Sequence, residues 1–87
     1  MSTHLDLDAL AMLVAVAETG GFTAAGARLG RTQSAVSGRV QDLEAALGKQ
    51  LLERFRRGLT TNEAGERLSG PARRRLAVAG WVRAALR

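Results

Sequence analysis

Glycine residues divide the first half of this chain into short segments, and this division limits the fold more than any other feature of the sequence. Each segment between the glycines has apolar residues at intervals of three or four, which is the spacing of a helix packed on one side. Glycine readily adopts the left-handed conformation at which helices end. The pattern therefore predicts three short helices, over residues 7–19, 22–29 and 33–47, that end at Gly20-Gly21, Gly30 and Gly48.

The first and third of these helices also carry start signals. Asp6 and Thr32 stand directly before them, and their side chains can accept hydrogen bonds from the exposed N–H groups of a first turn. The residues expected to face a core are Leu7, Leu10, Leu13, Val14 and Ala17 in the first helix, Phe22, Ala25 and Leu29 in the second, and Val36, Val40, Leu43 and Leu47 in the third.

The opposite face of the third predicted helix is small, polar and nearly uncharged. It consists of Ser34, Ser37, Gly38, Gln41 and Ala45, with Gln33 at its leading edge. A helix that faces only water usually carries Lys and Glu on its outer side. A face without bulk or charge instead suits a helix whose backbone must come close to another surface.

The second half of the chain predicts a hairpin followed by a long helix. Residues 50–54 and 59–61 are expected to form two strands, joined by a turn over residues 55–58 with the basic tip Arg56-Arg57. A last helix is then expected to begin after the capping residue Asn62 and to run toward Arg87. Pro71 should kink it or briefly break it, because proline removes one backbone hydrogen bond.

Together these elements predict a mainly α, winged helix-turn-helix fold. Residues 1–61 would form the winged domain, and residues 62–87 would form a linker or dimerisation helix.

Charge is unevenly distributed along the chain. Residues 1–48 hold three Arg against five acidic residues, a net charge of −2, whereas residues 49–87 hold ten Lys or Arg against three acidic residues, a net of +7. These sum to the formal net charge of +5. The basic half favours a polyanionic partner. Ordinary solvated charge on a long helix is the alternative.

A family resemblance extends from about Leu7 to Leu76 and rests on four segments of the sequence. In order, these are LVAVAETGGFTAAGARLG, TQSAVSGRVQDLEAALG, LLER and NEAGERL. With these pieces the chain resembles the N-terminal DNA-binding domain of LysR-type transcriptional regulators. The resemblance implies sequence-specific binding of double-stranded DNA by a bacterial transcription regulator. The third helix would enter the major groove, the wing would reach the neighbouring minor groove, and the last helix would pair two copies. Members of the family normally continue into a larger effector-binding domain.

The resemblance and the chemistry of the side chains predict two sets of DNA contacts. Base edges would be read by Gln33, Ser34, Ser37 and Gln41. Phosphates and the minor groove would be contacted by Thr32, Arg28, Arg31, Arg39, Arg54, Arg56 and Arg57. A solvated helix face is the alternative for the first set, and Arg54 could instead pair with Glu44 or Glu53.

Two residues depart from the family pattern on the third helix. Gly38 stands where the family frequently has a larger residue, commonly Arg, so one direct contact with a base edge would be absent here. Ser34 stands where the family often has Pro.

The last predicted helix has an apolar strip formed by Val78, Trp81, Val82, Ala85 and Leu86. In a monomer this strip would be exposed, so we expect it to form the interface of a homodimer. Packing against the first helix or against an absent effector domain is the alternative.

The residue inventory argues against several other classes of protein. The chain has no Cys and a single His, His4, and its glycines lack the spacing of a phosphate-binding loop, so neither enzymatic activity nor a metal or cofactor is expected. It shows no secretory signal and no apolar run of membrane-spanning length, so a cytoplasmic protein is expected. The remaining alternative is a winged helix that serves only to bind other proteins.

Overall fold

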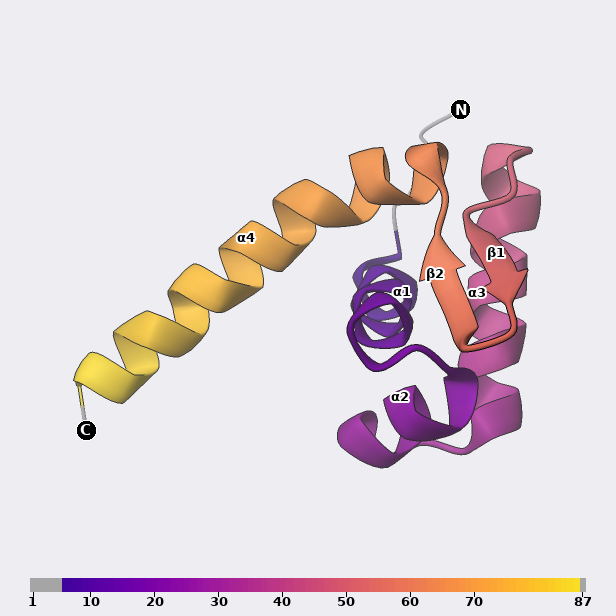
Figure 1. The fold of residues 1–87 in the computed structure, drawn as a ribbon. Helices are drawn as coiled ribbons and strands as arrows, with labels where there is room; N and C mark the ends of the chain where they lie inside the picture. Colours follow the sequence, from indigo (N-terminus) through magenta and orange to yellow (C-terminus); the bar gives the residue numbers. More distant parts are fainter. Residues whose placement is uncertain (1–5, 87) are drawn as a thin grey trace.

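The computed structural model describes residues 6–86, with only the backbone described for residues 76–84. It contains four helices and one two-stranded antiparallel sheet within that range (Figure 1). The elements are α1 (Leu7–Thr19), α2 (Phe22–Leu29), α3 (Gln33–Leu47), β1 (Leu52–Phe55), β2 (Gly58–Thr61) and α4 (Glu63–Ala85). The three short helices have the bounds that the sequence predicts, and the winged helix-turn-helix architecture is confirmed.

The predicted signals at the helix ends are also confirmed. The Asp6 carboxylate accepts hydrogen bonds from the N–H groups of Asp8 and Ala9, at 3.0 and 3.3 Å. The Thr32 hydroxyl accepts the N–H of Ala35 at 3.1 Å. The N-terminal end of α2 has no side-chain cap. The helices end at glycines in the left-handed conformation, Gly20, Gly30 and Gly48.

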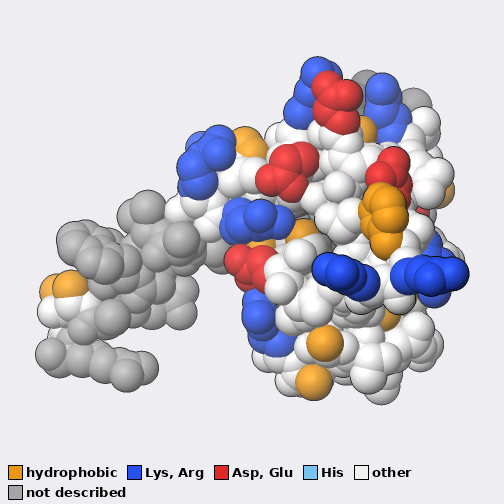
Figure 2. All heavy atoms as spheres, in the orientation of Figure 1, with side chains coloured by type: hydrophobic (Ala, Val, Ile, Leu, Met, Phe, Trp, Pro, Cys, Tyr) orange, Lys and Arg blue, Asp and Glu red, His pale blue; other side chains and the backbone are white. Residues whose placement is uncertain are grey.

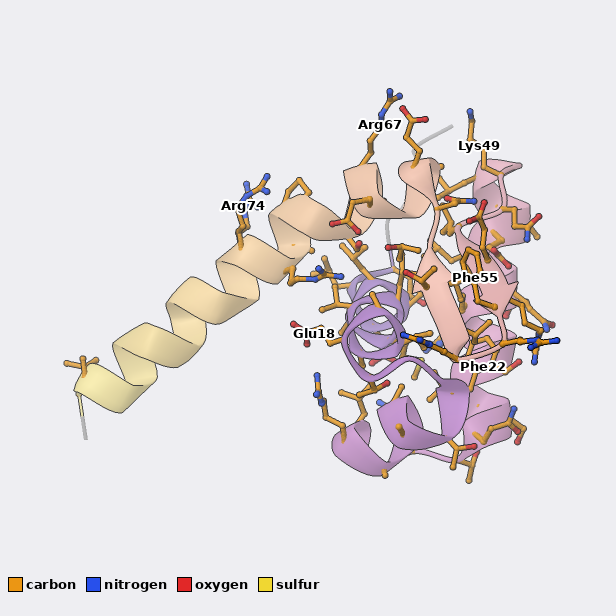
Figure 3. The ribbon with its side chains drawn as sticks, in the orientation of Figure 1. Glu18, Phe22, Lys49, Phe55, Arg67 and Arg74 are labelled. Carbon is orange, nitrogen blue, oxygen red and sulfur yellow. The ribbon has the colours of Figure 1, made fainter. Side chains whose placement is uncertain are left out.

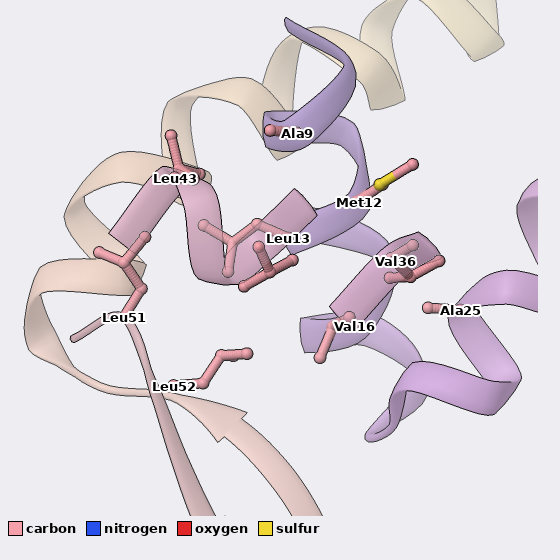
Figure 4. Packing of buried hydrophobic residues seen from close by; sticks show 11 residues of the cluster. Ala9, Met12, Leu13, Val16, Ala25, Val36, Leu43, Leu51 and Leu52 are labelled. Atoms are coloured by element: carbon pink, nitrogen blue, oxygen red, sulfur yellow. The ribbon is translucent and has the colours of Figure 1, made fainter. Parts of the chain in front are cut away.

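Helix α1 is the centre of the fold, and α2, α3, α4 and β2 all contact it. Figure 4 shows its side chains interleaved with those of α3 and of the segment that leads into β1. Met12, Leu13 and Val16 of α1 and Val36 of α3 are no more than 1% exposed. The hydrophobic core therefore lies around one helix and fixes α3 against it.

The single apolar stripe predicted for α1 was wrong in part. Leu7 is 76% exposed, and Leu10 and Ala17 are half-buried. The buried residues instead include five consecutive positions, which lie on all sides of the helix. The buried set is Ala9, Met12, Leu13, Val14, Ala15 and Val16. The reason is that neighbours approach α1 from several directions, so burial is not confined to one face.

Val36, Val40 and Leu43 of α3 are buried as predicted, but two predicted core residues are not. Leu29 is 36% exposed and Leu47 is 40% exposed. Each is the last residue of its helix, directly before the glycine at which the chain changes direction, so fewer neighbours surround it.

The hairpin starts two residues later than predicted. Leu51 lies opposite Asn62, the residue after β2, and its carbonyl still accepts the Asn62 N–H as in a strand pair. Its own N–H, however, donates to the Glu44 carboxylate of α3, so the second bond of that pair is not formed and β1 begins at Leu52. The return strand begins at Gly58, which pairs with Phe55, so Arg56 and Arg57 alone form the turn.

Helix α4 is continuous through Pro71, so the prediction that this residue could break the helix was wrong. Proline removes one backbone donor, and the rest of a long helix keeps its own hydrogen bonds. In Figure 1 the C-terminal part of this helix extends away from the other elements.

Within the described residues no single helix is long and apolar enough to cross a lipid bilayer. Helices α1 and α2 reach that length and composition only as a pair bent by 120°.

Candidate nucleic-acid interface

The outer face of α3 is open. Gln33, Ser34 and Gln41 are exposed, and Ser37 and Gly38 are partly exposed. Among the described residues, no atom beyond the helix's own lies within 4 Å of the position that a side chain on Gly38 would occupy. The polar groups bond to one another only at the limit of hydrogen-bond distance, as with the Gln41 amide and the Ser37 hydroxyl at 3.5 Å. The face can therefore accept another molecule close to its backbone.

A tight turn holds α3 in this position. The carbonyl of Gly26 in α2 accepts the N–H of Arg31 at 2.8 Å, so the chain turns at once into the cap residue Thr32. A side chain on Gly26 would lie 2.5 Å from the Arg31 carbonyl oxygen. The absence of a side chain at residue 26 thus lets α2 and the start of α3 approach closely. The N-terminal end of α3, with its unpaired N–H groups, can receive a phosphate.

The hairpin carries an exposed group of cations, which we call the wing arginines: Arg54 near the end of β1, and Arg56 and Arg57 in the turn. Figure 2 shows basic side chains on both sides of this turn. Within the described part of the chain, none of the three forms an ion pair. The alternative pairing of Arg54 with Glu44 or Glu53 is not present, and the Glu44 carboxylate accepts the N–H of Leu51 instead, at 2.7 Å.

The other three arginines predicted to contact phosphate form salt bridges with carboxylates of α1 or of its cap. Arg28 pairs with Glu18 at 2.7 Å and Arg31 pairs with Asp8 at 3.3 Å. Arg39 pairs with Asp6 at 3.0 Å and with Asp8 at 3.2 Å. These acidic partners were not predictable from local sequence patterns, because they lie 10 to 33 residues away along the chain.

The predicted dimer strip is described only in part. The side chains of Val78, Trp81 and Val82 lie outside the described residues. Ala85 and Leu86 are exposed, Leu86 to 80%.

Residues 7–66 match the family model of the bacterial regulatory helix-turn-helix proteins of the lysR family. The chain belongs to the LysR family. The match covers α1, α2, α3 and the hairpin and ends in the first turn of α4. It therefore contains the open face of α3 and the wing arginines.

Curated relatives of this LysR-family chain are transcriptional regulators. The regulator PtxR of Pseudomonas aeruginosa is 48% identical over 73 residues, which cover 84% of this chain and 23% of PtxR. An uncharacterized regulator of Azotobacter vinelandii is 45% identical over 82 residues, which cover 94% of this chain and 57% of that protein. The chain thus spans about a quarter of PtxR and little more than half of the Azotobacter protein.

Solved structures of LysR-family domains have the same fold. The structure of the CbnR DNA-binding domain with DNA superposes with a TM-score of 0.74 at 40% identity, covering 95% of this chain and all of that one.

Proposed function

We propose that this LysR-family domain binds double-stranded DNA sequence-specifically, with α3 in the major groove and the hairpin in the adjacent minor groove. The observation that carries the proposal is the combination of an open, uncharged α3 face with a hairpin whose arginines have no intramolecular ion pair in the described structure. The CbnR domain, similar over 95% of this chain, is solved in complex with DNA, which supports the same partner here.

The α3 face would read base edges. The Gln33 amide is both donor and acceptor, a combination that matches the major-groove edge of adenine. Ser34, Ser37 and Gln41 lie farther along the same face and would bond bases or phosphates. Gly38 has no side chain to reach a base, so it would instead allow close approach. Thr32 and the N–H groups at the start of α3 would hold a phosphate.

The wing arginines would supply most of the attraction to the DNA backbone. A guanidinium is favoured in a narrow minor groove, where the negative potential is strongest. Arg28, Arg31 and Arg39 stay predicted phosphate contacts, but each would have to leave a carboxylate first, so we assign the larger share to Arg54, Arg56 and Arg57.

The domain would act as a homodimer within a transcription regulator of the cytoplasm. Residues 1–61 would form the DNA-binding unit, and residues 62–87 would pair two copies through the predicted dimer strip. Two copies of α3 would then read half-sites separated by about one helical turn of DNA or a multiple of it.

A mobility-shift titration against duplex DNA at several salt concentrations tests this function. Changing Arg56 and Arg57 together to Ala should weaken binding to every duplex and flatten the dependence of log K on log salt, because phosphate contacts are lost. Changing Gln33 to Ala should relax preference at one base position, at a cost of about 1–3 kcal/mol.

Arg67→Ala is the matched control for loss of an arginine. Arg67 lies on the first part of α4, far from the hairpin turn in Figure 3, and pairs with Glu63 at 2.7 Å. Its replacement should leave DNA binding close to the wild-type level. A wild-type protein that retards no duplex at low salt would contradict the function. Equal loss on every sequence for the Gln33 variant would contradict the reading role of α3.

A further inference from the structure

Two arginines beside the proposed DNA surface share a carboxylate from the start of α1. Both terminal nitrogens of Arg31 bond to Asp8, one to each carboxylate oxygen, at 3.3 Å. Arg39 donates to the same carboxylate at 3.2 Å and also reaches Asp6 at 3.0 Å. Asp8 is thus the only carboxylate within ion-pair distance of Arg31 in the described structure, whereas Arg39 has two.

Arg31 lies at a point of the chain where a DNA phosphate is expected to bind. It directly precedes Thr32, whose hydroxyl caps α3, so its backbone lies at the N-terminal end of the helix proposed to enter the major groove. Helix N-termini attract phosphate groups. The side chains of Arg31 and Asp8 are 46% and 39% exposed, so a DNA phosphate could reach the pair from solvent.

We propose that Asp8 is a positioning residue that competes with DNA phosphate for Arg31 and so limits the affinity of the domain for DNA. The inference rests on the proposed function. Both anions present paired oxygens to the same planar guanidinium, and the forked arrangement with two hydrogen bonds suits either of them. The carboxylate belongs to the same chain, so its effective concentration at Arg31 is high. While the pair is intact, Arg31 adds little to the phosphate contacts.

The test compares the salt dependence of DNA binding for four proteins: wild type, Asp8→Asn, Arg31→Gln and the double variant. Asp8→Asn removes the competing charge and keeps the size of the side chain. Binding should become tighter, and the slope of log K against log salt should steepen by about 0.9 for each phosphate gained. Arg31→Gln should leave the wild-type slope nearly unchanged. In the Asp8→Asn background the same change should return the slope to the wild-type value.

Glu63→Gln is the charge-matched control. It raises the net charge by the same amount, but Glu63 pairs with Arg67 on α4 and contacts neither Arg31 nor Arg39 within the described structure. The slope of log K against log salt for Glu63→Gln should stay at the wild-type value. An equal effect of Glu63→Gln and Asp8→Asn would show that net charge alone is responsible and would overturn the competition.

Thermal unfolding of the same proteins without DNA separates competition from a purely structural role. If the Asp8 pairs only fasten α1 to α3, Asp8→Asn will lower Tm while the salt slope stays unchanged, and the inference is wrong. If the wild type binds DNA normally and only the slope prediction fails, the proposed function stands. If no variant binds any duplex, both fail.

Discussion

Two glycines inside helices have opposite surroundings, and a single side-chain methyl group would distinguish them. Gly65 lies in the first part of α4, where a Cβ atom would collide with the backbone carbonyl oxygen of Leu51 and would also press on Thr61. Gly38 lies in α3, where a Cβ atom would enter open space within the described structure. Packing therefore requires glycine at residue 65, whereas it places no such requirement on residue 38.

Gly65→Ala should accordingly destabilise the domain by about 1–3 kcal/mol, since neither backbone can move aside without cost. Gly38→Ala should stabilise it by about 0.5–1 kcal/mol, because alanine loses less conformational entropy in a helix. Urea unfolding followed by circular dichroism, without DNA, measures both. A stabilising effect of alanine at both positions would show that α4 does not approach Leu51 this closely.

The hairpin depends on its neighbours, as expected for a sheet of two short strands. At its base, the Leu51 N–H donates to Glu44 at 2.7 Å, and Leu51 is 2% exposed. At its other strand, the Leu59 N–H donates to the Gly20 carbonyl at 2.8 Å, which fixes the hairpin to the turn between α1 and α2. The wing arginines are thus presented by a hairpin attached at both strands.

Removing the Glu44 acceptor should loosen this attachment. Glu44→Ala leaves the Leu51 N–H buried without a partner and should cost about 1–3 kcal/mol. Glu44→Gln keeps a carbonyl oxygen at the same reach and should cost less. Trypsin cleavage after Arg56 and Arg57 should be faster in the alanine variant than in wild type, with the glutamine variant between them. Equal cleavage rates in all three proteins would mean that the hairpin does not depend on this bond.

The molecule as a whole has a compact body and a helix that extends from it (Figure 1). On the body, salt bridges to carboxylates balance Arg28, Arg31 and Arg39, whereas the wing arginines have no such partner in the described structure. The exposed Leu86 lies at the far end of α4. Apolar side chains on such an extended helix are costly to leave in water, which supports pairing of two copies.

Dimerisation should follow the predicted strip on α4. Trp81 is the only tryptophan of the chain, so its fluorescence reports on this strip alone. Its emission should shift to shorter wavelength as the protein concentration rises, and sedimentation should show a dimer. Trp81→Ala should shift the protein toward monomer and weaken DNA binding. Arg74→Ala, a change of an exposed residue on the same helix, should keep the dimer. A monomer at all concentrations would contradict the interface.

Much of the fold was predictable because its signals are local. The caps at Asp6 and Thr32 and the left-handed glycines act within three or four residues of the chain, so the sequence alone identified the bounds of α1, α2 and α3. The open face of α3 was predictable for the same reason, since one helical period places its small residues together.

What only the tertiary structure decided depends on residues that are far apart along the chain. The burial of α1 on several sides follows from which elements surround it, and the pairing of Arg31 with Asp8 joins residues 23 positions apart. The late start of β1 follows from the hydrogen bond that the Leu51 N–H donates to Glu44 of α3. Local periodicity carries no information about such partners, because they are brought together by the packing of one element on another. The sequence by itself therefore determined the helices, the hairpin and the open face of α3, and tertiary packing decided which arginines are paired with carboxylates in the described structure.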